Sequence, residues 1–271
     1  MTAASTAIVH PGARIHATST IGEYSIIEDG VEIGPHCRID SHVVIKRYTA
    51  LGEGNHIYSG AQLGIDPMGK KFREENRSYL RIGDNNVFRE YATISRATQA
   101  EAETTVGDNN YIMSYVHIAH DCHLASNITI CTCTGLAGHC TIEDGVFMSH
   151  GIGVHQFSKV GRLSMVAANT RINKDIPPYF LVSEFDAAAH GLNIVGLRRA
   201  GFTSETLTAL KQAYRLLYRS ALSREESLAR IEALNTPETK HLAAFIRTSK
   251  RGICPDYRAT QGSHSTTNSP E

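Results

Sequence analysis

The sequence lacks the features that mark several large classes of protein. It has no tryptophan. Its six cysteines include no C-x-x-C pair, which argues against a zinc site, and the cytosolic setting expected for this chain argues against disulfides. No stretch approaches the roughly 18 apolar residues of a membrane-spanning helix. Lys plus Arg and Asp plus Glu both total 27, so no net charge favours nucleic acid or a membrane surface. We therefore expect a cytoplasmic protein with no membrane span and no nucleic-acid partner.

What the sequence does have is an aliphatic residue at every sixth position. The first series is Val9, Ile15, Ile21, Ile27, Ile33, Ile39, Ile45, Leu51, Ile57 and Leu63. A second series runs from Ile82 to Ile172, where only Phe88 and Met148 are not plain aliphatics. This period predicts short strands joined by turns, with three strands in each coil of about 18 residues and coils stacked about 4.8 Å apart. A β-sandwich is disfavoured because its strands would be irregularly spaced.

Two polar segments, residues 64–81 and 95–105, interrupt the repeat. Because the repeat resumes after each of them, both are expected to loop out from the coil and return to it. The first domain therefore spans residues 1–190, with these two insertions.

Helical signals replace the repeat over residues 191–253, which we expect to form a small helical domain. Three predicted helix starts carry capping residues: Thr203 or Ser204, Ser223 with Glu226, and Thr236 with Pro237. The segment 254–271 is rich in Ser, Thr and Gly at its end and is expected to be a disordered tail.

Coil arithmetic brings several histidines together. Ile118, Leu136 and Val154 are 18 residues apart, so they share one wall in successive coils. The polar residues that flank them then gather near one edge: His117, His120, His139, His155 and Gln156.

Within this cluster, Asp121 directly follows His120 and can orient its imidazole as a general base. Gly138 lies 18 residues after His120 and offers a backbone N–H suited to an oxyanion. Two other interpretations are scattered surface histidines and a zinc site. The zinc ligands would come from His117, His120, Cys122, His123 and His139. The adjacent Asp121 favours the general base, and we expect no metal.

The sequence resembles the UDP-N-acetylglucosamine O-acyltransferases that begin lipid A synthesis. The resemblance depends on residues 117–122 (HIAHDC), 136–139 (LAGH), 154–157 (VHQF) and 175–179 (DIPPY), and on 191–194 (GLNI) and 196–199 (GLRR). It covers nearly the whole chain.

This resemblance implies a left-handed parallel β-helix, assembled as a homotrimer with active sites between subunits. It implies transfer of a (3-hydroxy)acyl group from acyl carrier protein to the 3-hydroxyl of UDP-N-acetylglucosamine, with no cofactor and no covalent intermediate. His120 would be the general base, Asp121 its support, and Gly138 the oxyanion donor.

The resemblance also implies binding roles for residues outside the catalytic group. Substrate contacts would come from His117, His139, His155, Gln156, Lys71, Asn193 and Arg199. Ala168 matches a position that limits acyl-chain length in the family. Docking of the acidic carrier protein would involve Arg198, Arg247, Lys250 and Arg251.

Several positions depart from the family pattern. Residues 68–72 read MGKKF where the family commonly has QDLKY, so Gly69 replaces an acidic sugar contact. Val195, Ala200 and Asp186 also replace residues usual in the family. These changes leave open an alternative acceptor, such as a 3-amino UDP-sugar that would be N-acylated.

Overall fold

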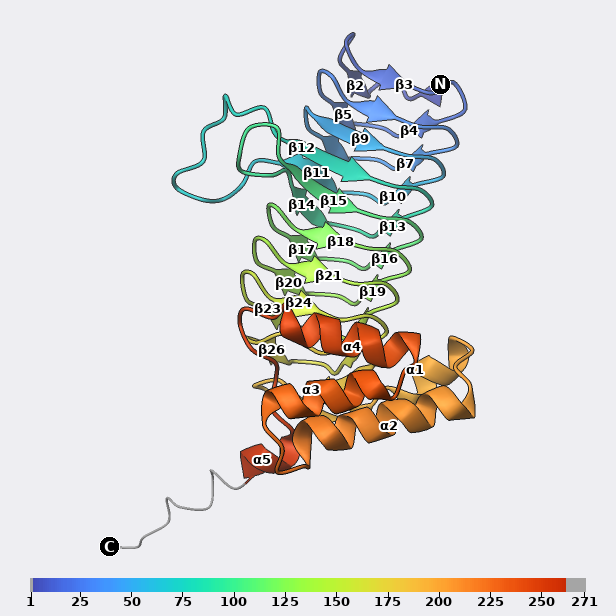
Figure 1. The fold of residues 1–271 in the computed structure, drawn as a ribbon. Coiled ribbons are helices and arrows are strands. Elements are labelled where there is room, and N and C mark those ends of the chain that lie inside the picture. The colour runs from blue at the N-terminus through green and yellow to red at the C-terminus, as the bar shows by residue number, and fades with distance from the viewer. Residues whose placement is uncertain (1, 262–271) are drawn as a thin grey trace, which may run out of the picture.

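The computed structural model describes residues 2–261 of the chain. Three sheets of mainly parallel strands form the walls of a triangular coil, and this coil is a left-handed parallel β-helix, as predicted. Figure 1 shows the coils stacked from the N-terminus at the top to a group of helices at the bottom. The helices therefore lie at one end of the β-helix.

Each wall is a ladder of very short strands, and every coil contributes one strand to each wall. Sheet A contains β1 (Thr2–Ala3), β4 (Thr20–Ile21), β7 (Arg38–Ile39), β10 (His56–Ile57), β13 (Val87–Phe88), β16 (Tyr111–Ile112), β19 (Thr129–Ile130), β22 (Phe147–Met148), β25 (Met165–Val166), β27 (Phe180–Ser183) and β28 (Ala188–Leu192). Sheet B contains β2 (Ile8–Val9), β5 (Ile26–Ile27), β8 (Val44–Ile45), β11 (Gln62–Ile65), β14 (Thr93–Ser95), β17 (His117–Ile118), β20 (Gly135–Leu136), β23 (Gly153–Val154) and β26 (Arg171–Ile172). Sheet C contains β3 (Arg14–Ile15), β6 (Glu32–Ile33), β9 (Thr49–Leu51), β12 (Tyr79–Ile82), β15 (Glu103–Val106), β18 (His123–Leu124), β21 (Thr141–Ile142) and β24 (Lys159–Val160).

The strand register follows the 18-residue spacing of the sequence. On sheet B, Ile118 pairs with Leu136 and Leu136 pairs with Val154, and all three side chains are at most 3% exposed. Each such burial stabilises the fold by about 1.5–3 kcal/mol. The aliphatic series therefore forms one continuous core along the coil axis.

The turns between walls use a left-handed backbone residue at most corners. Asp121 has a φ of 58° and His139 a φ of 61°, one coil apart at the corner between sheets B and C. Inside the corner between sheets C and A, buried asparagines satisfy the backbone: Asn86 Oδ1 accepts from the Asn110 N–H at 2.9 Å. The buried side chains of Asn86 and Asn110 thus pair with backbone groups of neighbouring coils.

The two insertions are shorter than the sequence predicts. Strands β11, β12, β14 and β15 extend into the ranges 64–81 and 95–105, because extended backbone at their ends pairs with the neighbouring coils. The loops proper span residues 66–78 and 96–102. Figure 1 shows them side by side, projecting from one flank of the coil.

Arg96 ties the two loops together. Its side chain is 0% exposed, and its guanidinium pairs with Asp66 at 2.9 Å and donates to the Glu74 carbonyl at 3.2 Å. The same guanidinium lies over the Phe72 ring, 4.9 Å from its centroid. Because a buried guanidinium requires such partners, the first loop is folded around a residue of the second.

The helical domain begins where the sequence predicts. After α1 (Ile194–Arg199), helix α2 (Ser204–Tyr218) is capped by Thr203, α3 (Arg224–Ala233) by the Ser223–Glu226 capping box, and α4 (Pro237–Arg247) by Thr236. These capping residues satisfy amide groups that have no partner within the helix. The three predicted starts are confirmed.

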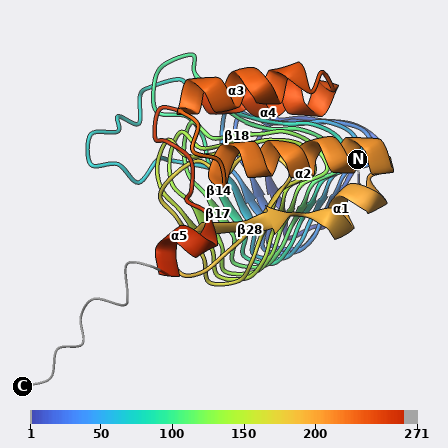
Figure 2. The ribbon, with the colours of Figure 1, turned by 60° about the horizontal axis from the view of Figure 1, so that its bottom comes forward.

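The helices close the C-terminal end of the coil, as Figure 2 shows from below. Helix α4 also reaches sheet C, where His241 Nε2 lies 2.9 Å from a carboxylate oxygen of Glu143. Within residues 2–261, no helix is long and apolar enough to cross a membrane.

The ordered chain extends beyond residue 253, contrary to the prediction of a tail disordered from residue 254. Cys254 and Asp256 are buried, and Asp256 accepts a 2.7 Å hydrogen bond from the Tyr214 hydroxyl of α2. A short helix, α5 (Tyr257–Gln261), follows. The side-chain anchors of Cys254 and Asp256 explain the difference, and residues 262–271 lie outside the described residues.

Replacing Arg96 with Met should lower the free energy of unfolding by about 2–4 kcal/mol, because it leaves the Asp66 carboxylate and two loop carbonyls without their donor. Chemical denaturation followed by circular dichroism measures the change. Arg47→Met is the matched control, since Arg47 pairs with Glu74 of the same loop at 2.9 Å but is far more exposed. Equal effects of the two substitutions would contradict a special role for the buried guanidinium.

Candidate active site

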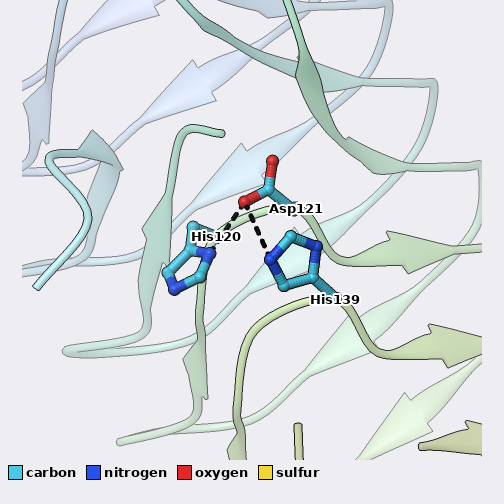
Figure 3. Close-up of side chains that lie close together, drawn as sticks. All are labelled: His120, Asp121 and His139. Carbon is cyan, nitrogen blue, oxygen red and sulfur yellow. Dashed lines mark hydrogen bonds and ion pairs between the residues drawn. The ribbon is translucent and has the colours of Figure 1, made fainter. Parts of the chain in front are cut away.

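The candidate site lies at the corner between sheets B and C. His120 and Asp121 form the turn after β17, and His139 occupies the equivalent turn one coil further on. Figure 3 shows both imidazoles directed toward the Asp121 carboxylate from these two turns. The sequence arithmetic had predicted this grouping.

Asp121 is the centre of the hydrogen-bond network. Its Oδ2 accepts from His120 Nδ1 at 2.8 Å and from the Thr98 hydroxyl at 2.8 Å, and His139 Nε2 lies 3.6 Å away. The Asp121 backbone N–H donates to the hydroxyl of Thr104 at 2.8 Å. The Asp121 carboxylate, 10% exposed, is therefore held in one orientation from several sides.

These contacts decide the charge of Asp121 and the proton position on His120. Burial alone would raise the pKa of the Asp121 carboxyl, but the hydrogen bonds from Thr98 and His120 outweigh it and hold the pKa below its usual range. An ionised carboxylate can only accept, so His120 Nδ1 must carry the proton that it donates. In the neutral imidazole, Nε2 is then left with a free lone pair.

Gly138 lies directly beneath the His120 ring. A Cβ at this position would collide with the imidazole, so a glycine is required for His120 to take its place. Within residues 2–261, no acceptor takes the Gly138 N–H. A donor beside the base is the arrangement that stabilises an oxyanion.

A groove of about 550 Å³ runs beside His120 along the outer face of sheet B. Its lining is Met68, Gly69, Ser95, His117, Ala119, His120, Gly135, Leu136, Ala137, Gly138, Gly153, Val154, His155, Gln156 and Arg171. The site thus combines a base, an N–H donor and a cleft long enough for an extended substrate.

Three of the predicted substrate contacts, His117, His155 and Gln156, line this groove. The His117 Nδ1 pairs with the Thr93 hydroxyl at 2.8 Å, and burial, followed by the charge of His120, lowers the pKa of His117. His139 stacks on Phe157 with 4.7 Å between ring centroids. Its place in the site comes from its contact with Asp121.

The structure does not bring the other predicted contacts to this groove. Lys71 lies exposed in the first loop, and Arg199 lies exposed at the end of α1. Asn193 caps α1 by accepting from the Gly196 N–H at 3.1 Å. Ala168 lies exposed in the turn between β25 and β26, outside the groove lining.

The four cations predicted for carrier docking differ in their surroundings. Arg198 and Lys250 are exposed. Arg247 is paired with Glu225 at 2.6 Å and Glu232 at 3.1 Å, whereas Arg251 donates to the Asn173 carbonyl at 3.0 Å. Arg247 and Arg251 therefore have structural partners within the chain.

Sequence reasoning missed Thr98 and Thr104, which hold Asp121 from the second insertion. No motif marks a threonine in a variable loop as part of a site. The available signal was weak: the second insertion ends at residue 105, 15 residues before His120 in the sequence.

The same cluster must be weighed as a cation site. Ligand atoms of His120, Asp121 and His139 lie within 4.8 Å of one another. However, Cys122 is buried inside the coil, and His123 pairs with Thr105 on sheet C at 2.9 Å, so neither joins them. The Asp121 oxygens already accept hydrogen bonds from His120 and Thr98. The donor set favours a hydrogen-bonded triad over a metal centre.

Comparisons with known proteins agree with this geometry. Residues 175–254 match the family described as UDP-N-acetylglucosamine O-acyltransferase, domain 2, and residues 12–47 match the bacterial transferase hexapeptide family. An acyl-[acyl-carrier-protein]–UDP-N-acetylglucosamine O-acyltransferase of Thermodesulfovibrio yellowstonii is 40% identical over 252 residues, covering 92% of this chain and 97% of that protein. One from Herminiimonas arsenicoxydans is 40% identical over 256 residues, with the same coverages.

Solved structures give the same result. The UDP-N-acetylglucosamine acyltransferase of Francisella novicida superposes with a TM-score of 0.92 at 35% identity, covering 99% of this chain and 100% of that one. The Moraxella catarrhalis enzyme gives 0.90 at 39% identity, covering 93% and 99%.

The fold and the site together define an acyltransferase of the hexapeptide-repeat class. Within that class, the chain belongs to the acyl-[acyl-carrier-protein]–UDP-N-acetylglucosamine O-acyltransferase family.

Thr98→Val should lower kcat about tenfold, because Asp121 loses one charge-assisted hydrogen bond worth roughly 1.4 kcal/mol. The KM values should change little, since Thr98 does not line the groove. Thr98→Ser keeps the hydroxyl and should restore activity. Steady-state kinetics of the three proteins test this, and an unchanged kcat in Thr98→Val would remove Thr98 from the positioning network.

Proposed function

We propose that this chain transfers a (3-hydroxy)acyl group from an acyl carrier protein thioester to the 3-hydroxyl of UDP-N-acetylglucosamine, the first step of lipid A biosynthesis. The observation that carries the proposal is the His120–Asp121 pair beside the unpaired Gly138 N–H in a long groove. The reaction is the one for which the chain's relatives are named.

In this mechanism, His120 Nε2 takes the proton from the sugar hydroxyl as its oxygen attacks the thioester carbonyl. The new C–O bond creates a tetrahedral oxyanion, which accepts a hydrogen bond from the Gly138 N–H. The C–S bond then breaks, and the proton held on His120 passes to the departing thiolate. Asp121 stabilises the imidazolium that exists between these steps. No step requires a metal or a cofactor.

The proposal includes a homotrimer in the cytoplasm. The corner between sheets A and B carries exposed aromatic side chains, Tyr24, Tyr91 and Tyr115, which suit burial against another copy of the chain. Asn193 and Arg199, which lie away from the groove of their own chain, would then be available to the site of a neighbouring subunit.

Sedimentation equilibrium should give three times the chain mass; a monomeric mass would contradict this part of the proposal.

Carrier-protein docking is proposed for the helical domain. Arg198 and Lys250 are its better candidates because both are exposed, whereas Arg247 and Arg251 are engaged within the chain. An acidic carrier would be attracted to such cations at low ionic strength.

A second acceptor is favoured by one observation. Gly69 lies in the groove lining, where it presents no side chain to the sugar. The catalytic pair would act equally on an amine, so a 3-amino UDP-sugar is the alternative substrate, with an N-acyl product.

Mass spectrometry of products distinguishes these acceptors. The purified protein is given a mixed 3-hydroxyacyl carrier-protein pool with either UDP-N-acetylglucosamine or its 3-amino analogue. We expect an O-acyl product from UDP-N-acetylglucosamine. The His120→Ala substitution should lower the rate of its formation by about 10²–10⁴-fold. An N-acyl product alone would establish the alternative, and no product from either sugar would contradict both.

The same assay tests the metal interpretation. Because the proposed base is a hydrogen-bonded imidazole, dialysis against a chelator should leave the rate unchanged. Loss of activity that zinc restores, with metal bound stoichiometrically to the protein, would instead make His120, Asp121 and His139 a catalytic metal centre.

A further inference from the structure

The peptide group between Ala137 and Gly138 is held from inside the coil by a thiol. Cys122 lies in the preceding coil, and its side chain is 0% exposed. Its Sγ–H donates to the Ala137 carbonyl oxygen at 3.2 Å. Within residues 2–261, no backbone N–H donates to this carbonyl. The thiol therefore supplies the donor that a carbonyl turned into the coil requires.

The direction of the carbonyl decides the direction of the neighbouring N–H. In a trans peptide group the C=O and the N–H point in opposite directions. Because the Ala137 carbonyl points at a thiol inside the coil, the Gly138 N–H points outward, into the groove that both residues line beside His120. Cys122 thus determines where the candidate oxyanion donor points.

The peptide groups on either side are fixed by ladder bonds instead. The Ala137 N–H donates to the Val154 carbonyl at 3.0 Å, and the Phe157 N–H donates to the Gly138 carbonyl at 3.1 Å. The peptide group between Ala137 and Gly138 has no such bond, and its second residue is a glycine, whose backbone rotates most easily. A flip of this one peptide would turn a carbonyl towards the groove in place of the donor. The thiol bond opposes that flip.

The corner between sheets C and A shows the same arrangement with an outer partner present. There, a buried side chain donates to a carbonyl from inside the coil, and the N–H of the same peptide donates to an exposed carboxylate. At Gly52–Glu53, the Cys37 thiol donates at 3.1 Å and Asp84 Oδ1 accepts at 2.7 Å. The other such peptides are Gly83–Asp84, held by Asn55 at 2.8 Å and Asp108 at 2.7 Å, and Ala125–Ser126, held by Asn110 at 3.0 Å and Asp144 at 3.1 Å.

The peptide group between Ala137 and Gly138 has the inner donor but lacks the outer carboxylate. In the described part of the chain, its N–H has no acceptor. The corresponding N–H groups at the other corner bind an anionic oxygen at 2.7–3.1 Å. Donors in oxyanion holes lie at such distances from the oxygen that they stabilise. The anionic oxygen missing beside His120 is therefore one that the reaction itself can supply.

We propose that Cys122 is a positioning residue of the acyl transfer, whose buried thiol holds the peptide group between Ala137 and Gly138 with its N–H facing the oxyanion. The inference rests on the proposed function, in which this N–H stabilises the tetrahedral oxygen. The thiol contacts no substrate and transfers no proton. Its hydrogen bond with Cys140, followed by burial, raises the pKa of Cys122, so the thiol keeps the proton that it donates.

Cys122→Ala should lower kcat about three- to tenfold, because the donor to the Ala137 carbonyl is lost. Both KM values should stay close to wild type, since the oxyanion exists only in the transition state and the intermediate. Cys122→Ser retains a donor and should restore kcat. Ser19 and Ser25 already make the same inward bond in other coils, at 2.7 and 2.8 Å. Steady-state kinetics of the full-length proteins measure these values.

Cys37→Ala is the matched control. It removes the same kind of thiol–carbonyl bond, at Gly52, which does not line the groove. Both alanine variants should lower the midpoint of chemical unfolding by similar amounts, but only Cys122→Ala should lower kcat. Cys122→Val fills the space without a donor, as Val116 does in the same position of its hexad, and should behave like Cys122→Ala.

The pH profile separates this role from a general disturbance of the corner. The thiol has no hydrogen bond to His120 or Asp121, so the apparent pKa of kcat should be the same in wild type and Cys122→Ala. A shifted apparent pKa would assign the loss of rate to Asp121, the preceding residue, and would contradict the proposal.

Two kinetic outcomes would also overturn it: an unchanged kcat in both Cys122→Ala and Cys122→Val, or an equal loss in Cys122→Ser and Cys122→Ala. If the wild-type protein transfers no acyl group, or if His120→Ala is as active as wild type, the failure lies with the proposed function instead. If Cys122→Ala does not fold, the comparison of Cys122→Ser with Cys122→Val decides the question.

Discussion

The 18-residue register of the coil is the constraint on which the rest of the structure depends. Residues one coil apart in sequence lie side by side, because their strands are hydrogen-bonded partners with buried aliphatic anchors behind them. The register places Gly138 beneath the His120 ring and His139 beside Asp121. A change in coil length between residues 118 and 138 would separate the base from its N–H donor, even with every side chain retained.

The catalytic corner also depends on residues that leave the coil. The second loop supplies Thr98 to Asp121, and Arg96 of that loop is enclosed by the first. The loops therefore support the candidate base. The buried Arg96 guanidinium fixes the two insertions, and Thr98 of the second insertion fixes the Asp121 carboxylate. This carboxylate in turn accepts the hydrogen bond from His120 Nδ1. This chain of contacts explains how a short turn with a left-handed residue can hold a reactive imidazole in one orientation.

Regular parts of the molecule could be predicted from the sequence, and irregular parts could not. The aliphatic period specified the walls, and the polar caps at Thr203, Ser223 and Thr236 specified the helix starts, because both signals are local. Contacts between distant segments leave no such signal. For this reason the strand extensions into the insertions, the anchoring of Asp256 by Tyr214, and the support of Asp121 by Thr98 emerged only in three dimensions.

The candidate site shows the same difference between regular parts, which the sequence predicts, and irregular parts, which it does not. Coil arithmetic grouped His120, Asp121, Gly138 and His139, since one period determines their positions. The same period places Arg171 one coil after Gly153, but it could not predict the Arg171–Asp186 pair, because Asp186 comes from the turn between β27 and β28, where the repeat has ended. The side chains of Asn193 and Arg199 belong to a region beyond the repeat, where the period gives no position.

The central claim is that His120, oriented by Asp121, is the base that deprotonates the acceptor. A crystal structure with UDP-N-acetylglucosamine bound tests it most directly. The account predicts the sugar 3-hydroxyl oxygen within about 3 Å of His120 Nε2, with Nδ1 still bonded to Asp121. A bound sugar whose 3-hydroxyl faces away from His120, towards another proton acceptor, would contradict it.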